Sequence, residues 1–410
     1  MAVARSQVAK VGSPVAQTFP PIGVEAIGDV VASAVAALDV RSTLLGDALG
    51  ATLADSLVAE SALPRVDTAA MDGYAVSGPG PSWLLRSEIR YAGHTGGRDL
   101  DSGVAVRIAT GAPTPRGATA VVRDEFVVRA RASGRSAILR APDAPLKDDT
   151  RRRGEHWERG DVLVSEGTRV CAAVVSAAAS AETPCGMVRG PVRADVLMTG
   201  DEIRVRGPLA AGQTRDSLSP VLPEFLRTCD IRSQHVWHLR DCRELLESWF
   251  SVSRDSEMVV VAGATGRGAA DHLRPVLAEI GARIVFDGVA MRPGGSQIVA
   301  VLPDGRVLLG LPGNPFAAIA ALMVTGPAIV DALTARTSRP RWWGRIIDRS
   351  GSAGAATRVL PVRQMPGGVW QTIGPVQTPH LADLIGCQAL ALVGPDVGRG
   401  GLVELLPLPW

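Results

Sequence analysis

The chain has 410 residues, which suggests about three domains at ~150 residues each. Its apolar fraction of 46% leaves material for at least one sizeable core, and this excludes intrinsic disorder and collagen-like structure. Lys+Arg total 43 against 41 Asp+Glu, so the net charge of +2 gives no electrostatic reason to expect a nucleic-acid or membrane partner. Only Lys10 and Lys147 are lysines, so nearly all cationic charge is arginine.

The cysteines and the N-terminus point to a cytoplasmic protein. The five cysteines are odd in number and form no C-x-x-C pair, which indicates reduced thiols rather than disulfides or a zinc site. We expect residues 1–22 to form a flexible tail, and charged residues and prolines interrupt it, so no secretion signal is predicted. The apolar stretch 309–330 is broken by prolines and a glycine and is not predicted to span a membrane.

The first half of the chain is predicted to contain a β module inserted into a helical domain. Helical spacing of apolar residues from Val24 to Val58 predicts one or two helices, and the Ala- and Val-rich stretch from Cys171 to Ala181 predicts another. Between them, short β-prone runs separated by Gly and Pro predict an all-β module over 61–144. The flanking segments 23–60 and 145–190 then form one linker domain.

The second half alternates between strand and helix patterns. Strands are predicted at 194–198, 233–237, 258–262 and 283–286, with helices around 222–229, 245–250 and 273–280 between them. This alternation predicts an open α/β sheet over 191–337. From residue 341 onward, short strands follow one another without helices, which predicts a small C-terminal β domain over 338–410.

Three loops are predicted to meet where ligands bind in such sheets, beyond the carboxyl ends of the strands. They are 199–202 (Thr-Gly-Asp-Glu), 263–268 (Gly-Ala-Thr-Gly-Arg-Gly) and 312–315 (Pro-Gly-Asn-Pro). Singly, each is readily explained as a turn or a helix cap. Together, they predict a ligand that carries phosphate. Mg²⁺ would suit the neighbouring carboxylates, although each alone is more often a surface charge: Asp201, Glu202, Asp241 and Asp271.

The β module carries two further motifs. Residues 67–75 contain two acids, a hydroxyl and a tyrosine, and residues 107–118 lead from a strand into a Thr-Gly-Ala-Pro turn. These segments are either ordinary hairpin corners or, together with the sheet loops, the facing wall of a cleft.

Five motifs in order resemble the molybdopterin molybdenumtransferase family, which includes the MoeA proteins and the E domain of gephyrin. They begin at Met71 (MDGYA), Thr110 (TGAP), Arg152 (RRGE), Thr199 (TGDE) and Leu311 (LPGNP). The resemblance implies an elongated four-part subunit with a molybdopterin-binding α/β domain. It also implies a homodimer, with the cleft between the α/β domain of one subunit and the β module of the other. Family members insert molybdenum from molybdate into adenylated molybdopterin, with Mg²⁺-dependent release of AMP.

By the same resemblance, catalytic roles fall on Asp72, Thr110, Glu202, Asp241, Asp271 and Arg292. Ligand-binding roles fall on Thr199, Gly200, Asp201, Asp216, Gly263, Gly266, Arg267, Gly268, Pro312, Gly313, Asn314, Pro315 and Arg363. The candidate Mg²⁺ ligands remain Asp201, Glu202, Asp241 and Asp271. Further candidate partners are other cofactor-synthesis proteins and recipient molybdoenzymes, with no nucleic acid and no membrane.

Departures from the family pattern leave two hypotheses open. Gly288 and Gly295 occupy positions where the family has lysines, whereas Arg292 keeps a positive charge. His156 replaces an acid, and Arg267 adds a charge to an altered glycine loop. The first hypothesis is an active enzyme with a rearranged anion site. The alternative is an impaired MoeA-like paralogue that binds molybdopterin, the finished cofactor or a partner protein without turnover. Another nucleotide or phosphosugar enzyme would not explain the β-module motifs.

Overall fold

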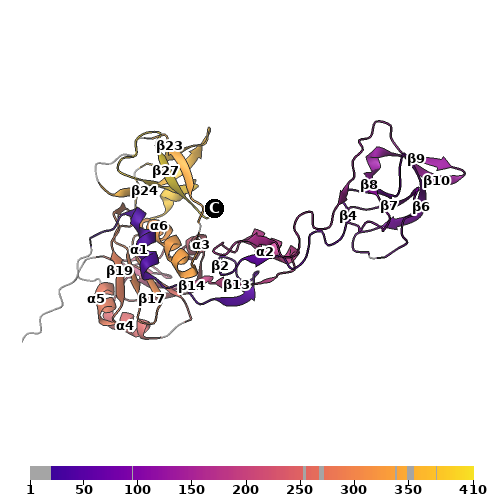
Figure 1. Cartoon of the computed structure of the whole chain (residues 1–410). Coiled ribbons are helices and arrows are strands. Elements are labelled where there is room, and N and C mark those ends of the chain that lie inside the picture. The colour runs from indigo at the N-terminus through magenta and orange to yellow at the C-terminus, as the bar shows by residue number, and fades with distance from the viewer. Residues whose placement is uncertain are drawn as a thin grey trace, which may run out of the picture.

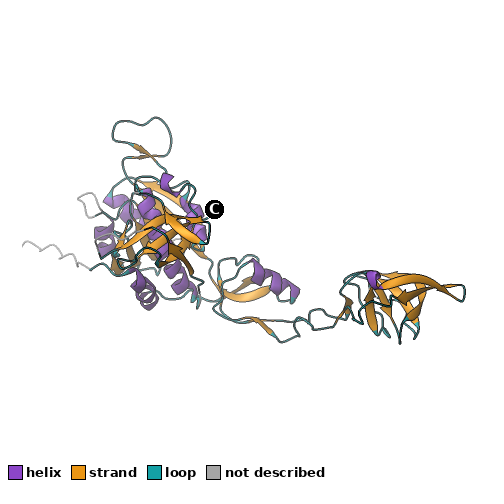
Figure 2. Ribbon diagram, turned by 90° about the horizontal axis from the view of Figure 1, so that it is seen from above, coloured by secondary structure: helices purple, strands orange, loops and turns teal. Residues whose placement is uncertain are grey.

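The chain forms an elongated molecule in which a β module stands at the end of a slender arm (Figure 1). The computed structural model describes residues 20–94, 96–252, 255–266, 272–337, 339–348, 355–374 and 376–410. An α/β body and a C-terminal β barrel lie together at one end, and the arm leads from them to the β module at the other. A second view, turned by 90°, shows the same separation (Figure 2).

The α/β body is built on a six-stranded sheet in the order β17-β14-β18-β22-β21-β19. The strands are β14 (Val192–Thr199), β17 (Ile231–Leu239), β18 (Met258–Ala262), β19 (Arg283–Asp287), β21 (Ile298–Val301) and β22 (Val307–Leu311). β21 runs antiparallel to both of its neighbours, and the other pairings are parallel. The carboxyl ends of β14, β17, β18, β22 and β19 therefore share one edge, and the predicted open α/β sheet is confirmed.

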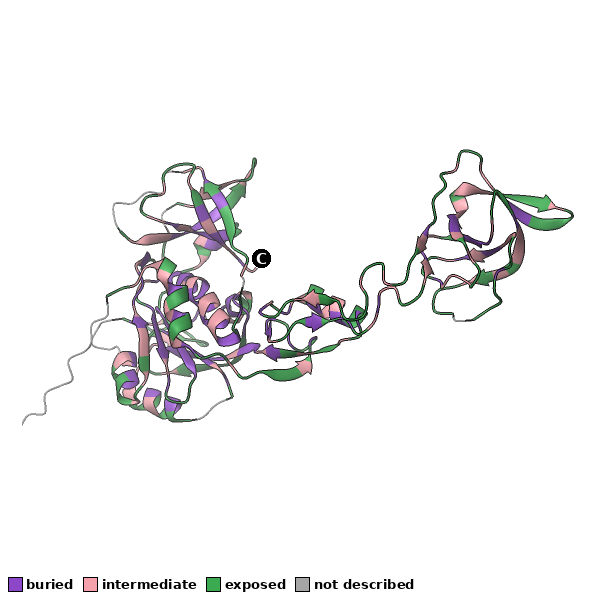
Figure 3. Cartoon of the chain, in the orientation of Figure 1, coloured by how far each residue is buried: buried purple, intermediate pink, exposed green. Residues whose placement is uncertain are grey.

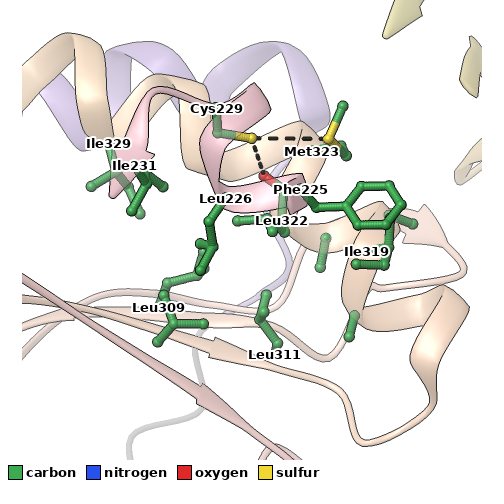
Figure 4. Packing of buried hydrophobic residues seen from close by; sticks show 14 of the residues in the cluster. Phe225, Leu226, Cys229, Ile231, Leu309, Leu311, Ile319, Leu322, Met323 and Ile329 are labelled. Atoms are coloured by element: carbon green, nitrogen blue, oxygen red, sulfur yellow. Dashed lines mark hydrogen bonds between the residues drawn. The ribbon is translucent and has the colours of Figure 1, made fainter. Parts of the chain in front are cut away.

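Helices cover both faces of this sheet because its central strands are apolar on both sides. Val260 in β18 packs against α1 (Ile27–Ala34), α3 (Leu222–Thr228) and α6 (Pro315–Thr334), as part of the cluster drawn in Figure 4. Its neighbours Val259 and Val261 face α4 (Arg243–Ser251) and α5 (Leu273–Glu279). Successive strand residues point to opposite faces, so a continuous apolar run needs cover on both.

Helix α6 is the one helix in the described part of the chain that is long and apolar enough to cross a membrane. However, 72% of its most apolar window is buried inside the protein. Asn314 precedes it, Pro315 begins it, and Ala335 ends it in a left-handed conformation. The helix is therefore the central core helix of the α/β body.

The arm consists of short strand pairs and one helix. β1 (Arg41–Leu44), β13 (Cys185–Arg189) and β2 (Thr52–Leu53) form a small sheet under α2 (Ala172–Ser180). Two two-stranded ladders then lead outward: β3 (Leu57–Val58) with β12 (Val162–Val164), and β4 (Thr68–Ala69) with β11 (Thr150–Arg151).

The prediction of helices throughout 24–58 was wrong beyond Ala34. The segment begins with η1 (Val24–Ala26) and α1, which packs on the α/β body rather than on the arm. The rest forms β1, β2 and β3, whose partners β13 and β12 lie more than a hundred residues further along the chain. Pairing with distant strands overrides local helical spacing, because strand propensity depends on context. The helix predicted at 171–181 is confirmed as α2.

The β module is a six-stranded sheet in the order β8-β5-β7-β6-β10-β9. Its strands are β5 (Gly73–Val76), β6 (Ser82–Arg90), β7 (Val104–Ile108), β8 (Ala120–Arg123), β9 (Val127–Ala132) and β10 (Arg135–Arg140), with η2 (Asp124–Phe126) between β8 and β9. Tyr74 packs into one apolar cluster and Ala75 into another, so the sheet buries both faces. The predicted β module is confirmed.

The C-terminal part is a closed β barrel. β24 (Thr357–Met365) pairs with both β25 (Val369–Thr372) and β26 (Ala389–Val393). β23 (Trp342–Ile346) and β27 (Leu402–Pro407) complete the ring. η3 (Ala382–Leu384) precedes β26. β20 (Met291–Arg292), which lies between β19 and β21 in the chain, adds to the barrel alongside β24 and joins the two bodies.

Candidate functional site

Three loops meet at the carboxyl edge of the α/β sheet, as predicted. The Gly263 amide, after β18, donates to Leu311 O at the end of β22 (3.2 Å). Gly263 has a φ of +117°, and a Cβ there would lie 2.4 Å from Thr199 O, at the end of β14. A Cβ on Gly313 would lie 3.4 Å from Gly263 Cα. The backbones of the three loops are therefore in contact, and Gly263 has to be glycine for both conformational and steric reasons.

The loop over 312–315 presents the start of α6 to this edge. Pro312 is buried, whereas Gly313 and Asn314 are exposed in front of Pro315, the first residue of a 20-residue helix. The N-terminus of such a helix favours an anion through its dipole. Pro315 has no N–H, and the Phe316 amide already donates to Thr378 O (3.1 Å). Gly200 and Gly266 lie on the two neighbouring loops, and Gly266 is exposed. Arg267, Gly268 and Asp271 fall outside the described residues, and α5 begins only at Leu273.

Two of the predicted carboxylates lie against each other. The Asp201 amide donates to Asp241 Oδ2 (3.3 Å), and the Asp241 amide donates to Asp201 Oδ1 (3.4 Å). A hydrogen bond from Arg240 lowers the pKa of Asp201. Burial, followed by the charges of Glu202 and Asp201, raises the pKa of Asp241. The same edge thus holds one carboxylate with a lowered pKa, Asp201, and one with a raised pKa, Asp241.

No group of three His, Cys, Asp or Glu side chains in the described ranges is arranged to hold a metal ion. Of the four predicted Mg²⁺ ligands, the structure brings Asp201 and Asp241 together and places Glu202 next in the chain, exposed. Asp271 cannot be placed.

Asp216 is buried and occupied by protein partners. Its carboxylate accepts hydrogen bonds from the Leu218 and Ser219 amides (3.1 and 2.9 Å), from the Ser219 hydroxyl and from His238 Nε2 (2.8 Å). Burial alone would raise the pKa of Asp216, but these bonds outweigh it and lower the pKa. This geometry suits a residue that holds the loop before α3 in place, while direct ligand contact by Asp216 stays a prediction.

Two arginines at neighbouring strand positions mark a cationic spot. Arg292 in β20 is paired in register with Arg358 in β24. Arg292 is exposed and Arg358 half-buried, and neither guanidinium has a hydrogen bond or ion pair with any described residue. An anion bound between two arginines accepts charge-assisted hydrogen bonds from both, which favours its binding.

The sequence pointed to Arg363 rather than Arg358. Arg363 lies five residues further along β24, and its guanidinium donates to Gln371 Oε1 (3.2 and 2.9 Å). Arg358 could be found only from the β20–β24 pairing, which is not visible in the sequence. Arg274 was also missed: it donates to Thr265 O (3.0 Å) and Gly266 O (2.8 Å) and binds Asp287, and so ties the loop after β18 to the end of β19.

The structure gives a backbone reason for glycine at 288 and 295, where the family resemblance predicts lysines. Gly288 has a φ of +110°, a left-handed conformation that favours glycine. A Cβ on Gly295 would lie 2.6 Å from Met291 O and 2.8 Å from Val289 O. The loop between them folds back on itself, with the Val289 amide donating to Gly295 O (2.9 Å). A side chain at 295 therefore does not fit this loop.

In the β module, the predicted pair Asp72 and Thr110 is in direct contact. The Asp72 carboxylate accepts hydrogen bonds from the Thr110 amide (2.7 Å) and hydroxyl (2.8 Å). These two bonds, the amide first, lower the pKa of Asp72. The RRGE motif is ordered beside them, since Arg152 binds both Asp67 (2.9 Å) and Asp148 (2.6 Å). All of this lies at the far end of the arm from the sheet loops (Figure 1), so one chain does not bring the two predicted walls together.

Three loops that meet at one edge of an α/β sheet, together with a remote β module and a C-terminal barrel, define a multidomain α/β and β protein. Known proteins agree with this description. The model of the MoeA N-terminal region (domains I and II) matches residues 22–181, and the model of a probable molybdopterin binding domain matches residues 195–331.

Curated relatives carry one name, molybdopterin molybdenumtransferase. The protein from Staphylococcus epidermidis is 29% identical over 313 residues, covering 72% of each chain. The one from Bacillus subtilis is 30% identical over 288 residues, covering 67% of this chain and 66% of its own.

Solved structures of MoeA proteins share the fold. A molybdopterin biosynthesis MoeA protein from Pyrococcus horikoshii matches 95% of this chain and 99% of its own, with a TM-score of 0.68 and 23% identity. A second structure from that organism has a TM-score of 0.71 at 18% identity and covers 94% of this chain. The chain belongs to the MoeA family of molybdopterin molybdenumtransferases.

Proposed function

We propose that the protein inserts molybdenum from molybdate into adenylated molybdopterin and releases AMP. It is a transferase of molybdenum cofactor biosynthesis, because curated relatives that match about 70% of its length bear that name. One observation carries the specific reaction: the three contacting loops lie beside the Asp201–Asp241 pair at a single sheet edge. This edge offers a helix dipole and loop amides to phosphate and carboxylates to a cation.

The proposed reaction needs no molybdenum ligand from the protein's cysteines. The dithiolene of molybdopterin supplies the sulfur ligands for molybdenum, so a cysteine ligand is not required, and all five cysteines are free thiols. The protein has to hold an adenylate and an oxyanion close together while limiting their repulsion. In this proposal, Arg292 and Arg358 bind the anionic groups, and Asp201 and Asp241 bind the cation.

Mg²⁺ fits the carboxylates of this edge. Burial and then the charges of Glu202 and Asp201 raise the pKa of Asp241, and a bound cation would offset both by favouring the ionised carboxylate. Mg²⁺ commonly binds through one or two carboxylates together with substrate phosphates and water, so three converging protein ligands are not needed. Asp201, Glu202 and Asp241 would hold the ion, and its role is to neutralise phosphate charge as AMP leaves.

The active species in this proposal is a homodimer. Asp72 and Thr110 belong to the β module, which lies remote from the sheet loops of its own chain (Figure 1). In a dimer with crossed arms, the β module of one subunit faces the sheet edge of the other, and each cleft contains groups from both. We place the dimer in the cytoplasm, where it would pass its product to recipient molybdoenzymes.

The test is a single-turnover assay with purified protein, adenylated molybdopterin, molybdate and Mg²⁺. AMP is followed by chromatography and protein-bound molybdenum by mass spectrometry. We expect AMP release and molybdenum loading in equal amounts, and neither without Mg²⁺. Tight binding of adenylated molybdopterin with no AMP release would contradict the proposal and support the impaired paralogue instead.

A further inference from the structure

The arm joins the α/β body through a polar contact. The apolar cluster of the arm, which includes Leu45, Leu53 and Val188, contains no α/β residue among those described. What crosses the boundary is hydrogen bonding: Arg232 to Leu49 O (2.9 Å), the Thr337 amide to Gly167 O (3.2 Å), and the network around Asp230. Each body thus keeps its own core, and the angle between them depends on polar groups.

Asp230, directly before β17, is the centre of this network. Its side chain is only 4% exposed. Arg169 of the arm donates from Nε to both carboxylate oxygens (2.8 Å each), and Arg336, just after α6, donates from Nη1 to Oδ2 (2.7 Å). Burial alone would raise the pKa of Asp230, but the hydrogen bonds from Arg169 and Arg336 lower it, so the carboxylate stays charged.

Arg336 reaches back across the same boundary. Its side chain is 1% exposed, and it donates from Nη2 to Gly50 O (3.0 Å) and from Nε to Thr52 Oγ1 (3.2 Å) in the arm. The Thr52 hydroxyl in turn donates to Thr334 Oγ1 (2.9 Å). The network therefore links two segments of the arm, around residues 50 and 169, to two segments of the α/β body.

The backbone of Asp230 has an unfavourable conformation, which indicates that its carboxylate is needed at this position. Asp230 has a φ of +65°, in the left-handed region where glycine is favoured. Gly50 packs against it, since a Cβ on Gly50 would lie 3.6 Å from Asp230 Cβ. Glycine would relax the conformation at position 230 but would leave the buried Arg336 without its carboxylate.

We infer that Asp230, Arg169 and Arg336 are positioning residues that fix the direction of the arm, and with it the place of Asp72 and Thr110 in the cleft. A buried ion network contributes little net stability after desolvation, but it demands one geometry. Because the β module lies at the far end of the arm (Figure 3), a small rotation at this joint becomes a large displacement of Asp72. A misplacement of ~1 Å can lower an enzymatic rate by about 100-fold. This inference rests on the proposed function, in which the module acts on another subunit.

The test compares Arg169→Gln with a matched surface variant, Arg227→Gln. Arg169 is 46% exposed, so its replacement leaves the Asp230–Arg336 pair intact inside the α/β body. Arg227 is 69% exposed and pairs with Glu224 within α3. For Arg169→Gln we expect AMP release to fall by about 10- to 100-fold, and small-angle X-ray scattering of the full-length protein to show a wider spread of maximum dimensions. The melting temperature and molybdopterin affinity should stay close to those of Arg227→Gln.

Arg169→Lys, which keeps the charge but not the fork, should fall between wild type and Arg169→Gln. If Arg169→Gln does not fold, Thr52→Val removes the arm's hydroxyl from the network without changing charge and should also widen the scattering distribution. Scattering and AMP release by Arg169→Gln equal to those of Arg227→Gln would overturn the inference. If wild-type protein releases no AMP, the proposed reaction fails, yet the scattering comparison still decides whether this joint fixes the arm.

Discussion

The sheet edge and the β-module tip both present carboxylates beside glycine turns, but their surroundings act on those carboxylates in opposite directions. At the tip, Asp72 is exposed and accepts two hydrogen bonds from Thr110, which lower its pKa. At the edge, burial raises the pKa of the half-buried Asp241, and the charges of Glu202 and Asp201 raise it further. Hydrogen bonds within the protein therefore stabilise the ionised form of Asp72, whereas the surroundings of Asp241 disfavour its ionised form. A perturbed pKa of this kind is typical of functional sites.

We expect Asp241→Asn to cause the largest loss of activity. The folded-state pKa of Asp241 is raised, so the folded protein binds this proton more tightly than the unfolded chain does. The ionised carboxylate therefore weakens the fold as pH rises through that pKa. We expect AMP release to fall by about 10³-fold, with a melting temperature at pH 7 equal to or slightly above that of wild type. A variant that keeps its activity, or that melts well below wild type, would contradict this view of the edge.

The cationic spot gives the next largest effect. Arg358→Ala should lower AMP release by about 10²-fold, because it removes one of two charges placed to bind an anion. Arg363→Ala should change it by less than ~3-fold, since Arg363 is engaged with Gln371. Steady-state assays of both variants test this ranking, and the reverse order would favour the sequence-based choice of Arg363.

At the tip, Thr110→Val should lower AMP release by roughly 10-fold. It removes the hydrogen bond from the hydroxyl to Asp72 but leaves the one from the backbone amide. The pKa of Asp72, followed by carbon-detected NMR, should rise toward its ordinary value. An unchanged pKa would show that the hydroxyl does not hold the carboxylate.

The smallest effect concerns stability. Gly295→Ala should lower the free energy of unfolding by about 1–3 kcal/mol, because its Cβ would overlap the carbonyls of Met291 and Val289. Gly28→Ala, in α1 with open space around it, is the control and should be neutral or stabilising. Chemical denaturation measures both, and equal effects would mean that Gly295 is not sterically required.

The parts of the fold that were predictable are those in which local pattern and final environment agree. The run Met258–Ala262 is apolar throughout and forms β18 with the same bounds, because a strand covered on both faces has no polar side. β1 was missed because its four residues gain their structure from pairing with Cys185–Val188, far along the chain. Short strands of this kind carry almost no local signal.

The candidate site likewise contains residues that could be predicted from the sequence and residues that could not. The meeting of Thr199, Gly263 and Gly313 could be expected from sheet topology, and the motifs placed Asp72 and Thr110 on one wall, although not in contact with each other. Arg358 could not, because its relation to Arg292 depends on a strand shared between two bodies. The steric demand at Gly295 and the burial of Asp216 under His238 are likewise products of three-dimensional packing.

The most direct test of the account is subunit complementation. Asp72→Asn disables the tip and Asp241→Asn disables the edge, so each homodimer should be inactive. If every cleft combines the edge of one subunit with the tip of the other, mixed dimers contain one cleft with both defects and one intact cleft. Co-expression with two affinity tags isolates these mixed dimers, and AMP release is then measured. We expect close to half of wild-type activity, whereas mixed dimers as inactive as the two parents would contradict a site shared between subunits.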